Sequence, residues 1–243
     1  MNEGAPITPR PGLIGSPFQP MNPKALVAIG GTLLFAGSLW GLLFAPAEVF
    51  MGDVYRILYI HVPTAWIGLL LLTAAFVCAL MYLLKGDFIW DDRLEATMEG
   101  GVVLSALLTV QGSIWARPTW GVWWDWDPRL TTTAILVITF AGILALRHSL
   151  SEPRRRAMVS SVAAIVAAAN VPLVYFSVRF WNSLHQVQSS PETVSAAFVW
   201  PLRTNAIAVL TLMAGLVTLR AETVARLRLN GSEPPPLLKD STS

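Results

Sequence analysis

The segment Val62–Leu84 reads V-P-T-A-W-I-G-L-L-L-L-T-A-A-F-V-C-A-L-M-Y-L-L and contains no charged residue. An α-helix rises about 1.5 Å per residue, so roughly 20 residues are needed to cross a hydrocarbon core of about 30 Å. The segment is therefore long enough to span a bilayer. It is also too uniformly apolar for a helix with one face in water. We predict a membrane-spanning helix here.

Five further segments are similarly apolar, and the whole chain has the composition of a membrane protein. Hydrophobic residues make up 54% of it and charged residues only 13%, with a mean hydropathy of +0.56. Only helices and closed barrels satisfy backbone groups in lipid, and these segments lack the alternation of barrel strands. We predict an all-α integral membrane protein with six transmembrane helices, the others at Ala25–Phe44, Gly100–Ala116, Leu130–Leu146, Ala157–Val178 and Thr204–Leu219. The last span is short unless it begins upstream, near Ala196.

Basic residues orient the six helices. An even number of spans places both termini on one side, and that side collects most Lys and Arg residues, including the run Arg154–Arg156. The positive-inside rule then predicts an N-in/C-in topology. We expect a membrane domain over residues 24–220, a disordered cytoplasmic tail over 1–23 and a second cytoplasmic tail over 221–243. The mixed-charge segment Lys85–Glu99 is interpreted as a solvated cytoplasmic connector.

Half of the ten tryptophans lie between Trp115 and Trp126, in W-A-R-P-T-W-G-V-W-W-D-W. This segment falls in the outer loop expected at about 113–130, between the third and fourth spans. Asp127 is a plausible helix N-cap and Pro128 a good first helical residue, which gives the loop a defined end. Interfacial tryptophans form ordinary aromatic belts, but such a concentration also suits a flat apolar platform for a ligand.

Two histidines are expected on the same outer side. His61 precedes Val62-Pro63, where the second span should begin because the residue before proline avoids helical geometry. His185 lies in the outer loop between the fifth and sixth spans. Histidines at helix ends are often structural, yet two imidazoles beside an aromatic plane suggest a metallated macrocycle such as haem. Five arginines on this side could hold its propionates: Arg56, Arg117, Arg129, Arg179 and Arg203.

Two motifs resemble a known family. Trp120–Thr131, W-G-V-W-W-D-W-D-P-R-L-T, resembles the WWD signature of the haem-handling membrane proteins of cytochrome c biogenesis. Tyr55–Pro63, Y-R-I-L-Y-I-H-V-P, resembles the first outer loop of one branch, the haem exporter protein C (CcmC) family of the system I pathway. The number of spans, the length and the two outer histidines agree with that branch. The resemblance covers the chain from Lys24 to about Leu219.

This resemblance implies a function and a site. The family binds haem, here expected as non-covalent haem b, at the periplasmic side of the bacterial inner membrane and passes it to a periplasmic haem chaperone (CcmE). By position, the axial iron ligands would be His61 and His185. The family also associates with ATP-binding cassette subunits (CcmA, CcmB) and a small membrane subunit (CcmD). The remaining expected site residues are Trp120, Trp123, Trp124 and Trp126 as the haem platform, with Asp127, Arg129, Arg56 and Arg117 as propionate or orienting contacts.

Other functions remain alternatives. The chain could be a haem-transporting permease subunit of an ABC-type exporter, although the inner halves of its spans offer few polar groups to line a path. An electron-transfer cytochrome would need histidine pairs within the spans. No nucleophile-and-base arrangement indicates an enzyme, and the phosphate-binding loop G-x-x-x-x-G-K-[ST] is absent from the sequence. Cys78 is expected to be a buried apolar residue, and Asn170 with Pro172 to mark a kink with a polar interhelical contact.

Overall fold

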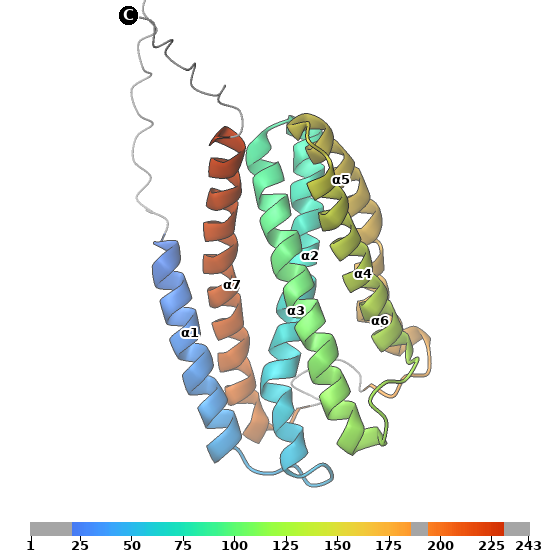
Figure 1. Ribbon diagram of the computed structural model, residues 1–243. Helices are drawn as coiled ribbons and strands as arrows, with labels where there is room; N and C mark the ends of the chain where they lie inside the picture. Colours follow the sequence, from blue (N-terminus) through green and yellow to red (C-terminus); the bar gives the residue numbers. More distant parts are fainter. Residues whose placement is uncertain (1–20, 186–193, 231–243) are drawn as a thin grey trace, which may run out of the picture.

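The computed structural model describes residues 21–185 and 194–230, in which nearly all regular structure is helical (Figure 1). This confirms the all-α class. The first transmembrane hairpin begins with α1 and two short irregular helices and continues into α2. The elements are α1 (Pro23–Leu39), η1 (Trp40–Phe44), η2 (Asp53–Ile57), α2 (Leu58–Lys85), α3 (Phe88–Trp120), α4 (Pro128–Ser149), α5 (Pro153–Ala168), α6 (Asn170–Phe180) and α7 (Ala196–Asn230).

The helices form an up-and-down bundle with six crossings, because α5 and α6 continue one another end to end (Figure 1). We call the end where α3 stops and α4 starts the pocket end, and the other the far end. The first residue of α1 and the last residue of α7 both lie at the far end (Figure 1). Five of the crossings are long and apolar enough to span a membrane by themselves. The sixth, α3, has 33 residues and packs beside α2.

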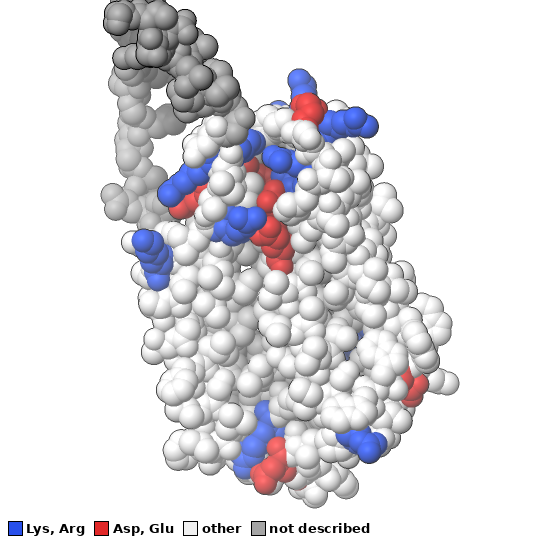
Figure 2. Space-filling view, viewed as in Figure 1, with Lys and Arg blue, Asp and Glu red and all other residues white. Residues whose placement is uncertain are grey.

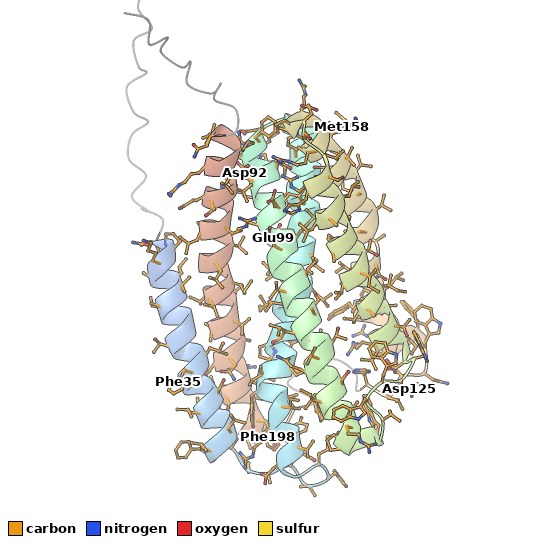
Figure 3. The ribbon with its side chains drawn as sticks, in the orientation of Figure 1. Phe35, Asp92, Glu99, Asp125, Met158 and Phe198 are labelled. Carbon is orange, nitrogen blue, oxygen red and sulfur yellow. The ribbon has the colours of Figure 1, made fainter. Side chains whose placement is uncertain are left out.

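The middle of the bundle presents apolar side chains to its surroundings. Charged side chains gather near the two ends and leave a white band between them (Figure 2). Large hydrophobic side chains are exposed along the helices, among them Phe35 on α1, labelled in Figure 3, and Ile138 on α4. A bundle with an apolar core and an equally apolar exterior is suited to lipid rather than water. The molecule is a multi-pass membrane protein.

The second span begins earlier than expected, and a buried asparagine allows this earlier start. α2 starts at Leu58, so that His61 is helical and Pro63 lies inside the helix. Proline has no N–H to donate to the carbonyl four residues before it, which here belongs to Tyr59. The side chain of Asn205 on α7, fully buried, donates to that carbonyl at 2.8 Å. The free backbone acceptor is therefore satisfied from a neighbouring helix.

The interpretation of Lys85–Glu99 as a solvated connector is wrong. α3 begins at Phe88 and is capped by Asp87. Acidic side chains in its first turns point into the bundle. Asp91 and Glu95 pair with Arg147 of α4, which is only 1% exposed, at 2.6 and 2.5 Å. Arg147 also donates to Ser160 of α5 at 2.8 Å. These acidic side chains are therefore buried partners of Arg147 and not solvated surface charges.

Further ion pairs extend this network to α7. Arg220 contacts Glu99 at 2.5 Å and Arg228 contacts Asp92 at 2.8 Å. Asp92 and Glu99 are labelled at the far end of α3, on the side toward α7 (Figure 3). Together with Arg147 these pairs join α3, α4, α5 and α7. They form a polar closure of the far end of the bundle.

The remaining boundaries differ modestly from those expected. α3 continues to Trp120, so the loop before α4 covers only residues 121–127 of the expected 113–130. α7 begins at Ala196, as the longer alternative for the sixth span required, and its helix continues to Asn230 into the expected 221–243 tail. The rest of both tails, 1–20 and 231–243, lies outside the described residues.

The expected kink in the fifth span is confirmed. The span is divided into α5 and α6 at Ala169, and the Asn170 side chain donates to the Thr132 carbonyl of α4 at 2.8 Å. Cys78 is buried in the apolar core, also as expected.

Candidate functional site

A mainly apolar pocket opens among α2, α3, α4 and α6 in the half of the bundle nearest the pocket end. His61 comes from α2, and His185 from the segment that follows α6, yet both line this one pocket. Arg129, in the first turn of α4, is the charged residue of the lining. The full lining is Met51, Leu58, His61, Val62, Ala65, Trp66, Leu69, Leu108, Thr109, Gly112, Trp115, Ala116, Thr119, Trp120, Arg129, Leu130, Thr133, Val174, Tyr175, Leu184 and His185.

Within the part of the chain that the structure describes, His61 is held by packing. Its ring stands edge-to-face against Trp115 of α3, with centroids 5.4 Å apart. A glycine in α3, Gly112, makes room for the imidazole, because a Cβ there would come within 3.4 Å of its Cε1. The Nδ1 atom is buried without a hydrogen-bond partner among the described residues. A buried polar atom normally has a partner. The imidazole of His61 is therefore suited to interact with a ligand bound in the pocket.

His185 is held by a hydrogen bond. Its Nδ1 lies 3.1 Å from Oδ1 of Asp127, and its ring stands edge-to-face against Trp120 with centroids 5.2 Å apart. Burial and the positive charge of Arg129 together lower the pKa of His185 more than the neighbouring Asp127 carboxylate raises it. The imidazole is therefore neutral at neutral pH, which is the form that binds metals.

Asp127 closes the loop onto α4, as the sequence predicted. Its Oδ1 accepts from the backbone N–H groups of Arg129 and Leu130 at 2.9 and 3.4 Å, and Pro128 is the first helical residue. Burial opposes ionisation of this carboxyl, but the hydrogen bonds from Ser183, Leu184 and Arg129 and the nearby His185 together keep the pKa of Asp127 below its ordinary value. The side chain is a buried carboxylate.

The four expected platform tryptophans separate into two groups. Trp120, the last residue of α3, lines the pocket next to His185. Trp124 and Trp126 stack edge-to-face on each other at 5.9 Å in the following loop. Trp126 is 78% exposed and Trp123 is 59% exposed, and none of these three lines the pocket. The structure therefore brings only the first tryptophan of the motif to the histidines.

The expected cationic residues also separate. Arg56 donates to the carbonyls of Gly41 and Ala45 at 3.0 and 2.7 Å and pairs with Asp53, which fixes the loop after α1. Arg117 donates to the Gly121 carbonyl at the end of α3. Only Arg129 of these lines the pocket. Arg179 and Arg203 stack on Phe176 and Trp200 instead.

Several pocket residues were not singled out from the sequence. Trp115 was counted with the tryptophan-rich stretch but not assigned to the platform, although the expected span Gly100–Ala116 already made it helical. Continuing the helix of the third span by one turn would have placed Trp115, Gly112 and Thr119 on one face. Ser183 and Tyr175 carried no recognisable signal, because their contacts come from tertiary packing.

The donor chemistry of the pocket fits haem. Among the described residues no group of three His, Cys, Asp or Glu side chains is positioned to hold a metal ion. Two imidazoles alone suit an iron that already has four porphyrin nitrogens. Apolar walls suit the macrocycle, and a single guanidinium suits a carboxylate. These features define the class of protein: a multi-pass helical membrane protein with a mainly apolar pocket lined by two histidines and an arginine.

Comparison with known proteins identifies the family. The model of the family described as "Heme exporter protein C" matches residues 17–232. Relatives named heme exporter protein C include those of Escherichia coli K12, 32% identical over 77% of both chains, and Haemophilus influenzae, 36% identical over 70% of this chain and 69% of the relative. That of Bradyrhizobium diazoefficiens is 33% identical over 75% of this chain and 71% of the relative. The chain belongs to the heme exporter protein C family.

Proposed function

We propose that this protein binds haem b non-covalently in the pocket, with His61 and His185 as axial ligands of the iron, and delivers it to the periplasmic haem chaperone during cytochrome c maturation. One observation carries the proposal: two histidines far apart in the sequence line the same apolar pocket beside two tryptophans. Family membership supports haem as the guest. In this account haem is cargo rather than a resident cofactor.

We propose that the pocket end faces the periplasm. Among the described residues, the far end bears about twice as many Lys and Arg residues as the pocket end, and Arg154–Arg156 is the densest group. The positive-inside rule then assigns the far end to the cytoplasm. The multi-pass fold and the family point to the inner membrane.

The residues proposed to hold haem follow from their places in the pocket. Trp115 and Trp120 provide aromatic walls, and apolar burial contributes roughly 25 cal/mol per Å². Arg129 is the propionate partner. The exposed Trp123 and Trp126 lie outside the pocket, where they are free to meet a soluble partner. Two imidazoles occupy both axial positions of iron, so delivery requires one of them to leave.

The far end gives little support to the alternative of a permease path through this chain. Its buried carboxylates are paired with arginines across α3, α4 and α7. We propose that energy coupling belongs to partner subunits of the ABC type (CcmA and CcmB), together with the small membrane subunit (CcmD). Haem reaches the site without passing through the far end of this bundle.

The proposed pocket is tested by filling it. Gly112→Leu places a side chain between His61 and Leu130, whose atoms lie 3.4 and 3.9 Å from the position of a Cβ. We expect saturable haem binding by the unmodified protein and its loss in this variant, measured by haem titration and Soret absorbance of the purified proteins in nanodiscs. The matched control is Gly142→Leu in α4, where an added Cβ meets nothing within 4 Å and the helix faces lipid.

Both variants exchange a helical glycine for leucine, so a general effect on stability would be common to them. Equal haem binding by the two variants would contradict the pocket assignment. Loss of binding in Gly112→Leu alone, with unchanged thermal stability, is the expected result.

A further inference from the structure

The carboxylate of Asp127 has more partners than a helix cap needs. A cap requires one oxygen to receive one or two N–H groups of the first turn, and Oδ1 does this for α4. The other oxygen, Oδ2, accepts from the Ser183 hydroxyl at 2.6 Å and from the Leu184 N–H at 2.7 Å. Both of these partners belong to the segment after α6. One buried side chain therefore joins two segments far apart in the sequence.

The same carboxylate fixes the imidazole of His185. Oδ1 lies 3.1 Å from Nδ1, and the backbone N–H of His185 donates to the Ser183 hydroxyl at 3.1 Å. Residues 183–185 are thus folded around Asp127, which is 5% exposed. A carboxylate has no proton to give, so Nδ1 must carry the hydrogen. The other ring nitrogen, Nε2, is left with its lone pair available.

We propose that Asp127 is the positioning residue of the haem site, which sets the ring orientation and tautomer of His185 so that Nε2 is presented to the iron. Carboxylate–histidine–metal arrangements of this kind orient ligands and raise their basicity in many metal sites. The proposal rests on the proposed function of the pocket. It goes beyond it by assigning a role to a residue that cannot itself touch the iron.

Charge excludes the other role open to this residue. A haem propionate is an anion, and a buried carboxylate beside it would repel it. The acceptor atoms of Asp127 are also already engaged with the partners described above. Arg129, two residues further on, remains the pocket group that suits a propionate.

The two iron ligands are consequently unlike each other. His61 is held by helix packing and by Trp115, and its Nδ1 has no partner among the described residues. His185 receives electron density through its bond to an anion. Asp127 thereby makes His185 the stronger donor of the pair and ties it to the start of α4, directly after the tryptophan-rich loop.

Three variants of the full-length protein in nanodiscs separate these roles. Asp127→Ser keeps the cap of α4 but is too short to hold His185. Asp127→Asn keeps an acceptor for Nδ1 but removes the negative charge. The matched control is Asp125→Ser: Asp125 lies in the same loop, is exposed, and is labelled at the edge of the bundle in Figure 3.

We expect Asp127→Ser to weaken haem affinity about 10- to 100-fold, the usual cost of losing such a partner, and to decrease the low-spin fraction of the bound haem. Asp127→Asn should remain low-spin but raise the reduction potential, since the neutral amide stabilises ferric iron less. Asp125→Ser should match the unmodified protein in all three measurements. A merely structural cap would leave the reduction potential unchanged in Asp127→Asn.

A second background tests that Asp127 acts through His185. In His185→Gly, free imidazole can occupy the axial position without help from Asp127, so adding Asp127→Ser should have no further effect on the imidazole-restored spectrum. The proposal is overturned if Asp127→Ser and Asp127→Asn both keep the spectrum, potential and affinity of the unmodified protein. Failure of the proposed function is a different result: the unmodified protein itself would then show no haem spectrum that depends on His185.

Discussion

His61→Ala and His185→Ala should each convert bound haem from a six-coordinate low-spin species to one that is high-spin or mixed. Each substitution removes one imidazole and opens one axial position, while the apolar walls and Arg129 remain. We expect haem affinity and transfer of haem to the periplasmic chaperone both to fall by at least about tenfold. Optical absorption and electron paramagnetic resonance of the purified variants measure the spin state directly.

The third histidine provides the control. His148 lies in the last turn of α4 at the far end, is exposed, and its Nδ1 contacts the carbonyl of Leu144. His148→Ala should leave the spectrum unchanged. If His61→Ala and His185→Ala both kept the unmodified low-spin spectrum and normal chaperone loading, neither residue would be an iron ligand.

Arg147→Met should destabilise the protein by about 3–5 kcal/mol, the cost of breaking a buried ion pair and leaving a charge without its partner. Arg147 is 1% exposed, and Asp91, its bidentate partner, is 0% exposed. Without the guanidinium, the Asp91 carboxylate would stay buried against apolar neighbours. Thermal unfolding in detergent should show a much lower midpoint, and haem binding at 4 °C should survive if the protein remains folded.

Compensation distinguishes this cause from loss of side-chain volume. Adding Asp91→Leu to Arg147→Met removes the orphaned charge, so we expect part of the lost stability to return. Glu95 would still have Arg220, which lies 3.3 Å away. The surface control is Arg155→Ala, because Arg155 is exposed on α5 and surface charges contribute little. An effect of Arg155→Ala as large as that of Arg147→Met would argue against the buried network.

Most of the fold could be predicted because its main determinant is local. Uncharged runs such as Val62–Leu84 identify spans by themselves, and a proline after an aspartate marks the start of α4. The segment Lys85–Glu99 was misinterpreted for the opposite reason. Its acidic residues become buried only through arginines on α4 and α7, and no local pattern in the sequence contains that pairing.

The start of α2 illustrates the same limit. The Val62-Pro63 pair indicates a helix start because the residue before proline avoids helical geometry. The Asn205 side chain from α7 nevertheless satisfies the Tyr59 carbonyl and lets the helix begin earlier. The partner is remote in sequence, so the pattern around Pro63 could not reveal it. In both cases the local pattern fails because the deciding polar partner lies on another helix.

The residue types that line the site could be predicted from the sequence more accurately than their positions in the structure. His61 and His185 were both expected on one side, and the structure brings them to one pocket. The tryptophan motif was expected to form a single platform, yet only Trp120 of the four lines the pocket. α3 continues as a helix to Trp120 and ends at Gly121, which caps it with a positive φ of 79°. The later tryptophans of the motif therefore lie in the loop that follows.

The most direct test of the central claim is the absorption spectrum of the haem-loaded protein, purified in nanodiscs, before and after addition of the periplasmic haem chaperone. The account predicts a low-spin bis-imidazole spectrum that depends on both His61 and His185 and disappears as haem passes to the chaperone. A bound haem that is high-spin in the unmodified protein, or a low-spin spectrum that persists without either histidine, would contradict it.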